Sequence, residues 1–147
     1  MTTTTTQIYH VFIRATAEEV WEAITRPEHT VRYFYGASID TTEHERINRG
    51  PDGSDWGTEA VLEFDPPRRL VHEWRSGYDE ELAAEPASRV TWEISPSDDG
   101  TCLVTLTHDR LEGSPKTAEG VEGTGWMYVL SALKTVLESG ASLVKSP

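Results

Sequence analysis

The sequence predicts an α+β protein in which an antiparallel sheet packs against one long C-terminal helix. A strand followed by a capped helix is predicted over residues 11–28. Residues 61–74 and 89–112 each predict a β-hairpin. Residues 125–140 carry apolar side chains at helical spacing, which is typical of an amphipathic helix. A sheet and a helix arranged in this way can enclose a cavity, although the pattern does not say what fills it.

The length bounds the domain organisation. With 147 residues the chain can bury a core, and we expect one domain over residues 7–140. We expect flexible tails at residues 1–6 and 141–147. No apolar run is long enough to span a membrane, and the threonine-rich start does not resemble a signal peptide. The single cysteine, Cys102, excludes an internal disulfide and favours a cytoplasmic location.

The net charge of −12 limits the possible partners. Nucleic-acid binding requires basic side chains that neutralise phosphates, so we expect no nucleic-acid partner. An anionic membrane surface is disfavoured for the same reason. Much of the acid falls in predicted loops, where solvated carboxylates maintain solubility; attraction of a basic partner is the alternative interpretation.

The first elements are a strand and two short helices. Residues 7–15 alternate with a period of two, which predicts a strand. Thr16 and Glu19 have the spacing of a capping box, so a helix should begin there and run to about Thr25. Pro27 suits the first turn of a second short helix.

The next segments predict strands with defined faces. Residues 38–47 form a weak strand, and Pro66-Pro67 ends the strand at 58–65. In that strand Ala60 and Leu62 should share one face, opposite Glu59 and Val61. The residues predicted to face the C-terminal helix are Leu62, Phe64, His72, Trp74, Val90, Trp92, Val104 and Leu106. Those predicted to face solvent are Glu63, Glu73, Arg75 and Glu93.

The last helix should begin at Thr124 and end near Gly140. Its apolar stripe contains Trp126, Leu130, Leu133 and Leu137. Four glycines within residues 113–125 predict a broken approach to this helix. That approach is either an ordinary loop or a gate to the cavity.

Four pieces of the sequence resemble the activator-of-heat-shock-protein-90-ATPase family, within the START and Bet v 1-like superfamily. They are AxxEEVWEAITRPE at 15–28, DPPRRLVHEW at 65–74, GTCLVTLTH at 100–108, and Trp126 followed by Leu130 and Leu133. The resemblance implies a helix-grip fold: a curved antiparallel sheet around a long C-terminal helix, with two short helices after the first strand. It brings no fixed catalytic motif. The chain departs from the commoner family pattern at Tyr33-Phe34-Tyr35-Gly36 and in the acidic segment 79–86, where a pocket mouth would lie.

Ten residues are predicted to line a ligand-binding cavity, because such pockets combine aromatic and apolar groups with a few polar ones. They are Tyr33, Phe34, Tyr35, Phe64, His72, Trp74, Trp92, His108, Trp126 and Leu130. His72 and His108 are either core histidines with local partners or hydrogen-bonding points for a ligand. The five histidines lack metal-ligand spacing, so no metal or other cofactor is expected. No catalytic residue is predicted, and Cys102 reads as a buried core residue.

Three functions remain open at this level. The first is the binding of a small hydrophobic molecule, aromatic or polyketide-like, which the resemblance also implies for the superfamily. The second is a co-chaperone or other protein-interaction domain. The third is a cyclase-like enzyme acting on a cyclic or polyketide substrate, which would need a titratable pair in the cavity. The sequence does not indicate the oligomeric state.

Overall fold

A computed structural model describes residues 6–121 and 124–141 and shows twelve elements within them. The strands are β1 (Gln7–Ile13), β2 (Ser38–Thr41), β3 (Glu45–Arg49), β4 (Asp55–Asp65), β5 (Arg69–Trp74), β6 (Ser88–Pro96) and β7 (Cys102–Asp109). The helices are α1 (Ala17–Thr25), α2 (Pro27–Thr30), α3 (Glu80–Ala83), α4 (Pro115–Val121) and α5 (Thr124–Ser139). The strands form one antiparallel sheet in the order β1-β7-β6-β5-β4-β3-β2.

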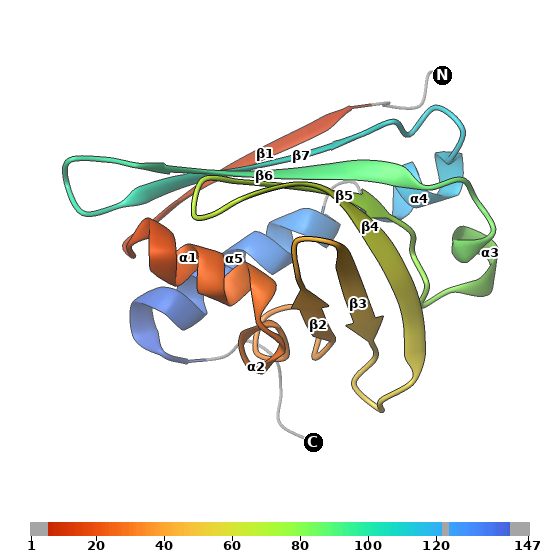
Figure 1. Cartoon of the computed structure of the whole chain (residues 1–147), viewed down its shortest axis with the longest axis horizontal. Coiled ribbons are helices and arrows are strands. Elements are labelled where there is room, and N and C mark those ends of the chain that lie inside the picture. Colours follow the sequence, from red (N-terminus) through yellow and green to blue (C-terminus); the bar gives the residue numbers. More distant parts are fainter. Residues whose placement is uncertain (1–5, 122–123, 142–147) are drawn as a thin grey trace.

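The sheet curves around α5 (Figure 1). Helices α1 and α5 lie on the same side of the sheet, and β2, β3 and β4 bend down beside them. Helices α3 and α4 lie together at one end of the molecule. The predicted α+β helix-grip fold, with two short helices after the first strand, is therefore confirmed.

The start of α1 is fixed by local chemistry. Thr16 Oγ1 accepts a hydrogen bond from the Glu19 backbone N–H at 3.1 Å, and Glu19 Oε1 accepts one from the Thr16 N–H at 3.0 Å. These two bonds satisfy backbone donors that a helix start leaves unpaired, so the predicted capping box is confirmed. After α2, the buried Tyr33 hydroxyl donates to the Ala23 carbonyl at 2.7 Å and ties this segment back to α1.

The faces of β5, β6 and β7 agree with the prediction. The side chains predicted to point inward on these strands are buried: His72, Trp74, Val90, Trp92, Val104 and Leu106. On the outer face, Arg75 is exposed, and Glu73 and Glu93 are half-buried. The inward row therefore supplies the sheet side of the hydrophobic core.

Strand β4 departs from the prediction. Its pairing with β5 shifts between Val61 and Glu63, so β4 contains an extra residue there. A bulge of this kind reverses which face the alternate residues point to. Leu62 is 48% exposed and Ala60 is exposed, whereas Glu59 is buried. The predicted inward positions of Leu62 and Ala60 are wrong, and so are the outward positions of Glu59 and of Val61, which packs against the core.

Residues 38–47 also differ from the expected single strand. They form β2 and most of β3, an antiparallel pair in which Thr41 lies opposite Arg46 and Ile39 opposite Asn48. The side chains of all four residues are buried. Two of the polar residues that made this segment look like a weak strand, Thr41 and Arg46, therefore face inward, whereas Asp40, Glu43, His44 and Glu45 are exposed.

Helix α5 closes the core. Trp126, Leu130 and Leu133 are buried, and Leu137 packs against the core from a half-buried position. Gly140 has a φ of 75°, and its N–H donates to the Val136 carbonyl at 2.9 Å. This conformation is the left-handed helix end that favours glycine, so the predicted C-terminal cap is confirmed.

The glycine-rich approach to α5 is partly helical, because α4 occupies Pro115–Val121. Within the predicted gate at 113–125, residues 122–123 lie outside the described residues. The predicted tails also fall largely outside them, at residues 1–5 and 142–147.

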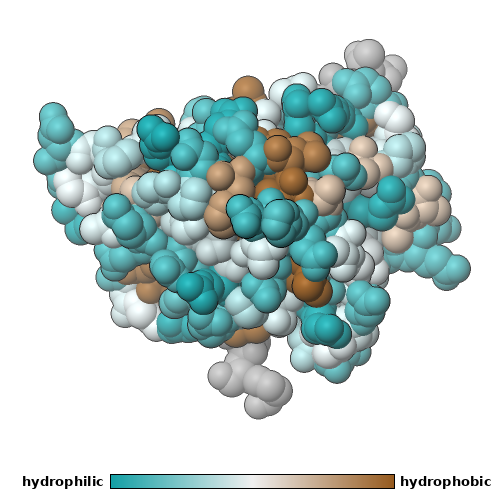
Figure 2. Space-filling view, viewed as in Figure 1, coloured by the Kyte–Doolittle hydropathy of each residue, from teal (hydrophilic) through white to brown (hydrophobic). Residues whose placement is uncertain are grey.

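The surface in Figure 2 is mostly hydrophilic, with a small group of hydrophobic residues near the centre of this face. Across the described residues, the exposed large apolar side chains are Ile8, Phe12, Val31, Tyr35, Leu62, Tyr78 and Met127, which come from several different elements. No helix of the described chain is long and apolar enough to cross a membrane.

Candidate ligand-binding cavity

A cavity of about 390 Å³ lies between the curved sheet and α5. It is lined by Phe34, Tyr35, Ala37, Ile39, Arg46, Asn48, Trp56, Glu59, Trp74, Arg75, Gly77, Tyr78, Gly120, Val121, Gly125, Trp126 and Val129. Most of these side chains are apolar or aromatic. Tyr35 and Tyr78 are about half exposed, at 48% and 49%, and therefore mark the mouth of the cavity.

Three aromatic rings form the inner apolar wall. The ring centroids of Trp74 and Trp126 are 5.1 Å apart, and Phe34 lies 5.8 Å from Trp126 and 6.2 Å from Trp74. All three side chains are at least nine-tenths buried. Because they contact one another as well as the cavity, they hold its shape while presenting flat apolar surface to it.

The mouth is held by close contacts. Tyr35 has a φ of 54°, its hydroxyl donates to the Gly125 carbonyl at 3.1 Å, and its ring stacks on Tyr128 at 4.9 Å. On the other side, a Cβ at Gly77 would sit 1.8 Å from the Trp56 carbonyl oxygen. Only glycine therefore allows the segment after β5 to pass this close to β4.

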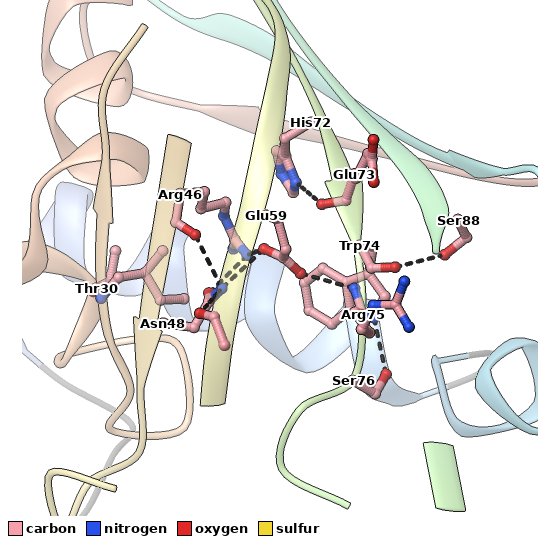
Figure 3. Close-up of polar contacts among 12 residues, drawn as sticks. Thr30, Arg46, Asn48, Glu59, His72, Glu73, Trp74, Arg75, Ser76 and Ser88 are labelled. Atoms are coloured by element: carbon pink, nitrogen blue, oxygen red, sulfur yellow. Dashed lines mark hydrogen bonds and ion pairs between the residues drawn. The ribbon is translucent and has the colours of Figure 1, made fainter. Parts of the chain in front are cut away.

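A buried polar cluster faces the same cavity. Arg46 and Asn48 extend from β3 toward Glu59 on β4 (Figure 3). Arg46 Nη1 donates to Glu59 Oε1 at 2.8 Å and to Asn48 Oδ1 at 2.9 Å, and Asn48 Nδ2 donates to Glu59 Oε1 at 2.9 Å. The second carboxylate oxygen of Glu59 accepts from the Arg75 N–H at 2.8 Å.

The cluster is almost fully removed from water. The side chains of Arg46 and Glu59 are 3% and 5% exposed. The Arg46 guanidinium lies 5.3 Å from the ring centroid of Trp74 and 5.7 Å from that of Phe34, which is the geometry of cation–π contacts. A buried charge pair of this kind costs desolvation and is stable only when both partners are present.

Sequence reasoning missed this cluster. The available signal was opposite charge on successive strands, Arg46 in one and Glu59 in the next. Alternation alone placed Glu59 on the outer face, because the bulge in β4 leaves no mark in the hydrophobic pattern.

The structure brings four of the ten predicted site residues to the cavity: Phe34, Tyr35, Trp74 and Trp126. The other six do not line it: Tyr33, Phe64, His72, Trp92, His108 and Leu130. Phe64 instead contacts Trp21 edge-on at 5.1 Å. Leu130 and Tyr33 are buried in the core around the cavity.

His72 and His108 are held by indole donors. Trp92 Nε1 donates to His72 Nε2 at 3.1 Å, so His72 carries its proton on Nδ1 and donates to the Glu73 carbonyl at 2.8 Å. Trp126 Nε1 donates to His108 Nδ1 at 3.0 Å, so His108 donates from Nε2 to Ser88 Oγ at 2.7 Å. Both rings are therefore neutral and fully engaged, which favours core histidines over ligand contacts.

Burial lowers both histidine pKa values. The pKa of His108 falls from 6.5 to about 4, and burial is the main cause. The pKa of His72 lies well below 6.5, through burial first and then through the nearby Arg46 charge. Neither imidazole is thus protonated near neutral pH.

These pKa values predict acid sensitivity. Both histidines bind protons more readily in the unfolded chain than in the folded one. Their neutral forms therefore contribute fully to the free energy of unfolding above about pH 6.5, and this contribution is lost as the pH drops toward 4. For His108 alone the full loss is about 3 kcal/mol. Urea unfolding at pH 7.5 and pH 5.0 should show a smaller difference for His108→Gln than for the wild type. The exposed His44→Gln is the control; equal pH dependence in all three proteins contradicts the prediction.

The described residues do not indicate a metal centre or a reactive thiol. They contain no group of three or more histidine, cysteine or carboxylate side chains placed to hold a metal ion. Cys102 is buried, its Sγ lies 3.2 Å from the Ala15 carbonyl oxygen, and burial raises the pKa of its thiol. It does not line the cavity.

The chain is similar to a known protein family and to several solved structures. Residues 14–138 match the family model described as "Activator of Hsp90 ATPase homolog 1-like protein". No curated protein sequence matched the chain. Protein SSP2350 from Staphylococcus saprophyticus has a similar structure, with a TM-score of 0.73 and 21% identity, over 96% of this chain and 97% of that one.

Two further solved structures are similar. CalU16 from Micromonospora echinospora gives a TM-score of 0.69 and 26% identity, over 94% of this chain and 77% of that one. Aha1 from Colwellia psychrerythraea, solved as a dimer, gives a TM-score of 0.71 and 15% identity, over 92% of this chain and 97% of that one. These likenesses support the fold.

Proposed function

The chain belongs to the activator of Hsp90 ATPase homolog 1-like family, and from that membership and its cavity we propose that it binds a small hydrophobic, aromatic or polyketide-like molecule. The observation that carries the proposal is the partly open cavity of about 390 Å³ walled by Phe34, Trp74 and Trp126. Its size lies within the range of small-molecule sites, roughly 300–1,000 Å³. Its combination of flat rings with a few polar groups is also typical of such sites.

Binding without turnover is the form of this function that the side chains support. General acid–base catalysis needs a group that can give or take a proton next to the substrate. His72 and His108 do not line the cavity, and each of their ring nitrogens already makes a hydrogen bond within the protein. The cavity carboxylate, Glu59, already accepts from Arg46, Asn48 and the Arg75 N–H.

A planar apolar compound carrying a hydroxyl or carbonyl, such as 2-acetylnaphthalene, should bind at micromolar concentration, about −8 kcal/mol. It should quench tryptophan fluorescence, because three of the five tryptophans line the cavity, and it should raise the melting temperature. Trp74→Phe should reduce the quenching, whereas Trp21→Phe, which lies outside the cavity, should not.

The compound should be recovered unchanged. If a broad set of planar compounds neither shifts the melting temperature nor quenches fluorescence, the binding proposal fails and a protein-partner role, as a co-chaperone, becomes the better hypothesis. If a compound is recovered altered, the protein is an enzyme, and the cyclase-like alternative replaces binding.

A further inference from the structure

The Arg46 side chain has hydrogen-bonding capacity left over. Its two side-chain hydrogen bonds, to Glu59 and Asn48, are both donated by Nη1. Within the described part of the chain, Nε and Nη2 have no acceptor. They are not sealed off, because the only inaccessible, unpartnered side-chain oxygen or nitrogen among the described residues is Thr41 Oγ1. Arg46 is itself one of the residues that line the cavity.

The polar neighbours of Arg46 in the cavity wall are already engaged. Asn48 Oδ1 accepts from Arg46, and Asn48 Nδ2 donates to Glu59 and to the Gly57 carbonyl at 3.2 Å. Both oxygens of Glu59 accept hydrogen bonds. What this cluster offers an occupant is therefore donors, and arginine has no acceptor to offer.

The guanidinium is held in place before any ligand arrives. Phe34 and Trp74 flank it at 5.7 and 5.3 Å, and Glu59 anchors one end of its planar fork. Among the charged residues that line the cavity, Arg46 is paired with Glu59, and the Arg75 guanidinium donates instead to the Ala83 and Glu85 carbonyls. A fixed, desolvated arginine with free N–H groups binds anionic oxygens strongly, since charge-assisted hydrogen bonds are about twice as strong as neutral ones.

We propose that the cavity selects aromatic molecules that carry an acidic oxygen, a carboxylate or phenolate, and that Arg46 binds this oxygen through Nε and Nη2. The aromatic body lies against Phe34, Trp74 and Trp126. This inference rests on the proposed binding function and adds the chemical class of the ligand and the residue that sets its polarity.

Three probes that share the naphthalene ring test which charge the cavity prefers: 2-naphthoate, 2-methylnaphthalene and 2-naphthylmethylammonium. Isothermal titration should show 2-naphthoate binding the wild-type protein at least about 10-fold more tightly than the other two, or about 1.4 kcal/mol. The double variant Arg46→Met/Glu59→Gln removes both buried charges together and keeps the net charge, so no charged group is left unpaired. Its preference for 2-naphthoate should shrink to less than about 2-fold.

A matched control comes from the same strand. Arg49→Met/Glu45→Gln removes one cation and one anion at exposed positions of β3 and should keep the preference. An NMR titration of the Arg46 Nε–H resonance provides a direct readout, which should shift with 2-naphthoate and not with 2-methylnaphthalene.

The two proposals fail in different ways. If 2-methylnaphthalene binds as tightly as 2-naphthoate, or if the double variant keeps the preference, the role of Arg46 is overturned while the binding function stands. If the ammonium probe binds most tightly, the ligand polarity is the opposite of the one proposed. If none of the three probes binds, the inference about Arg46 fails, and the binding function fails with it only when 2-acetylnaphthalene and the broader set of planar compounds are inactive as well.

Discussion

Replacing Trp126 with alanine is expected to lower the free energy of unfolding by about 3–5 kcal/mol. Trp126 is 2% exposed and its ring lies within 6 Å of the ring centroids of Phe34, Trp74, Trp92 and His108. It begins the apolar stripe by which α5 closes the sheet, so its removal leaves a large void beside the cavity. Urea unfolding at pH 7.5 measures the loss.

Trp126→Phe separates packing from hydrogen bonding. It keeps an aromatic ring but removes the N–H that donates to His108 Nδ1, which leaves a buried acceptor unpaired at a cost of about 1–3 kcal/mol. It should therefore destabilise the protein less than Trp126→Ala. A loss below about 1 kcal/mol for the alanine variant means instead that Trp126 lines an open, solvated mouth.

Breaking the buried Arg46–Glu59 pair is expected to cost about 3–5 kcal/mol in either single variant, Arg46→Met or Glu59→Gln. Each substitution leaves a charge buried without its counter-charge, because both side chains are 5% exposed or less. The double variant removes both charges, so its loss should be well below the sum of the single losses. A double-mutant cycle from urea unfolding gives the coupling directly.

An exposed ion pair is the comparison for this cycle. Arg26 and Glu22 lie 3.1 Å apart with side chains 56% and 53% exposed, and Glu22→Gln should cost less than about 1 kcal/mol. If the two single variants of the buried pair cost no more than Glu22→Gln, water reaches the cluster. In that case Arg46 and Glu59 do not stabilise the sheet in the way that their burial implies.

The sequence by itself determined the features that depend on neighbours along the chain. Thr16 and Glu19 cap α1 because a three-residue spacing suffices for both hydrogen bonds. Gly140 ends α5 because glycine, which has no Cβ, adopts the left-handed conformation without steric strain. The inward faces of β5, β6 and β7 follow from strict alternation, and the C-terminal stripe follows from helical periodicity.

The sequence predicted only the aromatic residues of the candidate site, namely Phe34, Tyr35, Trp74 and Trp126. The other aromatic and histidine candidates have the same residue chemistry but contact neighbouring side chains or backbone instead of the cavity. Trp92 donates to His72, for example, and neither lines the cavity. Residue type alone cannot separate an inward side chain that meets a neighbour from one that meets open space.

Only the tertiary structure decided the polar part of the cavity. The extra residue in β4 restarts the alternation, and this places Glu59 inside rather than outside. The pairing of β3 with β4 then sets Arg46 directly opposite Glu59, so that two charges 13 positions apart neutralise each other. A charged side chain facing the core and one facing water look identical in a sequence. What distinguishes them is the partner that strand pairing brings within hydrogen-bonding distance, because only that partner offsets the cost of burial.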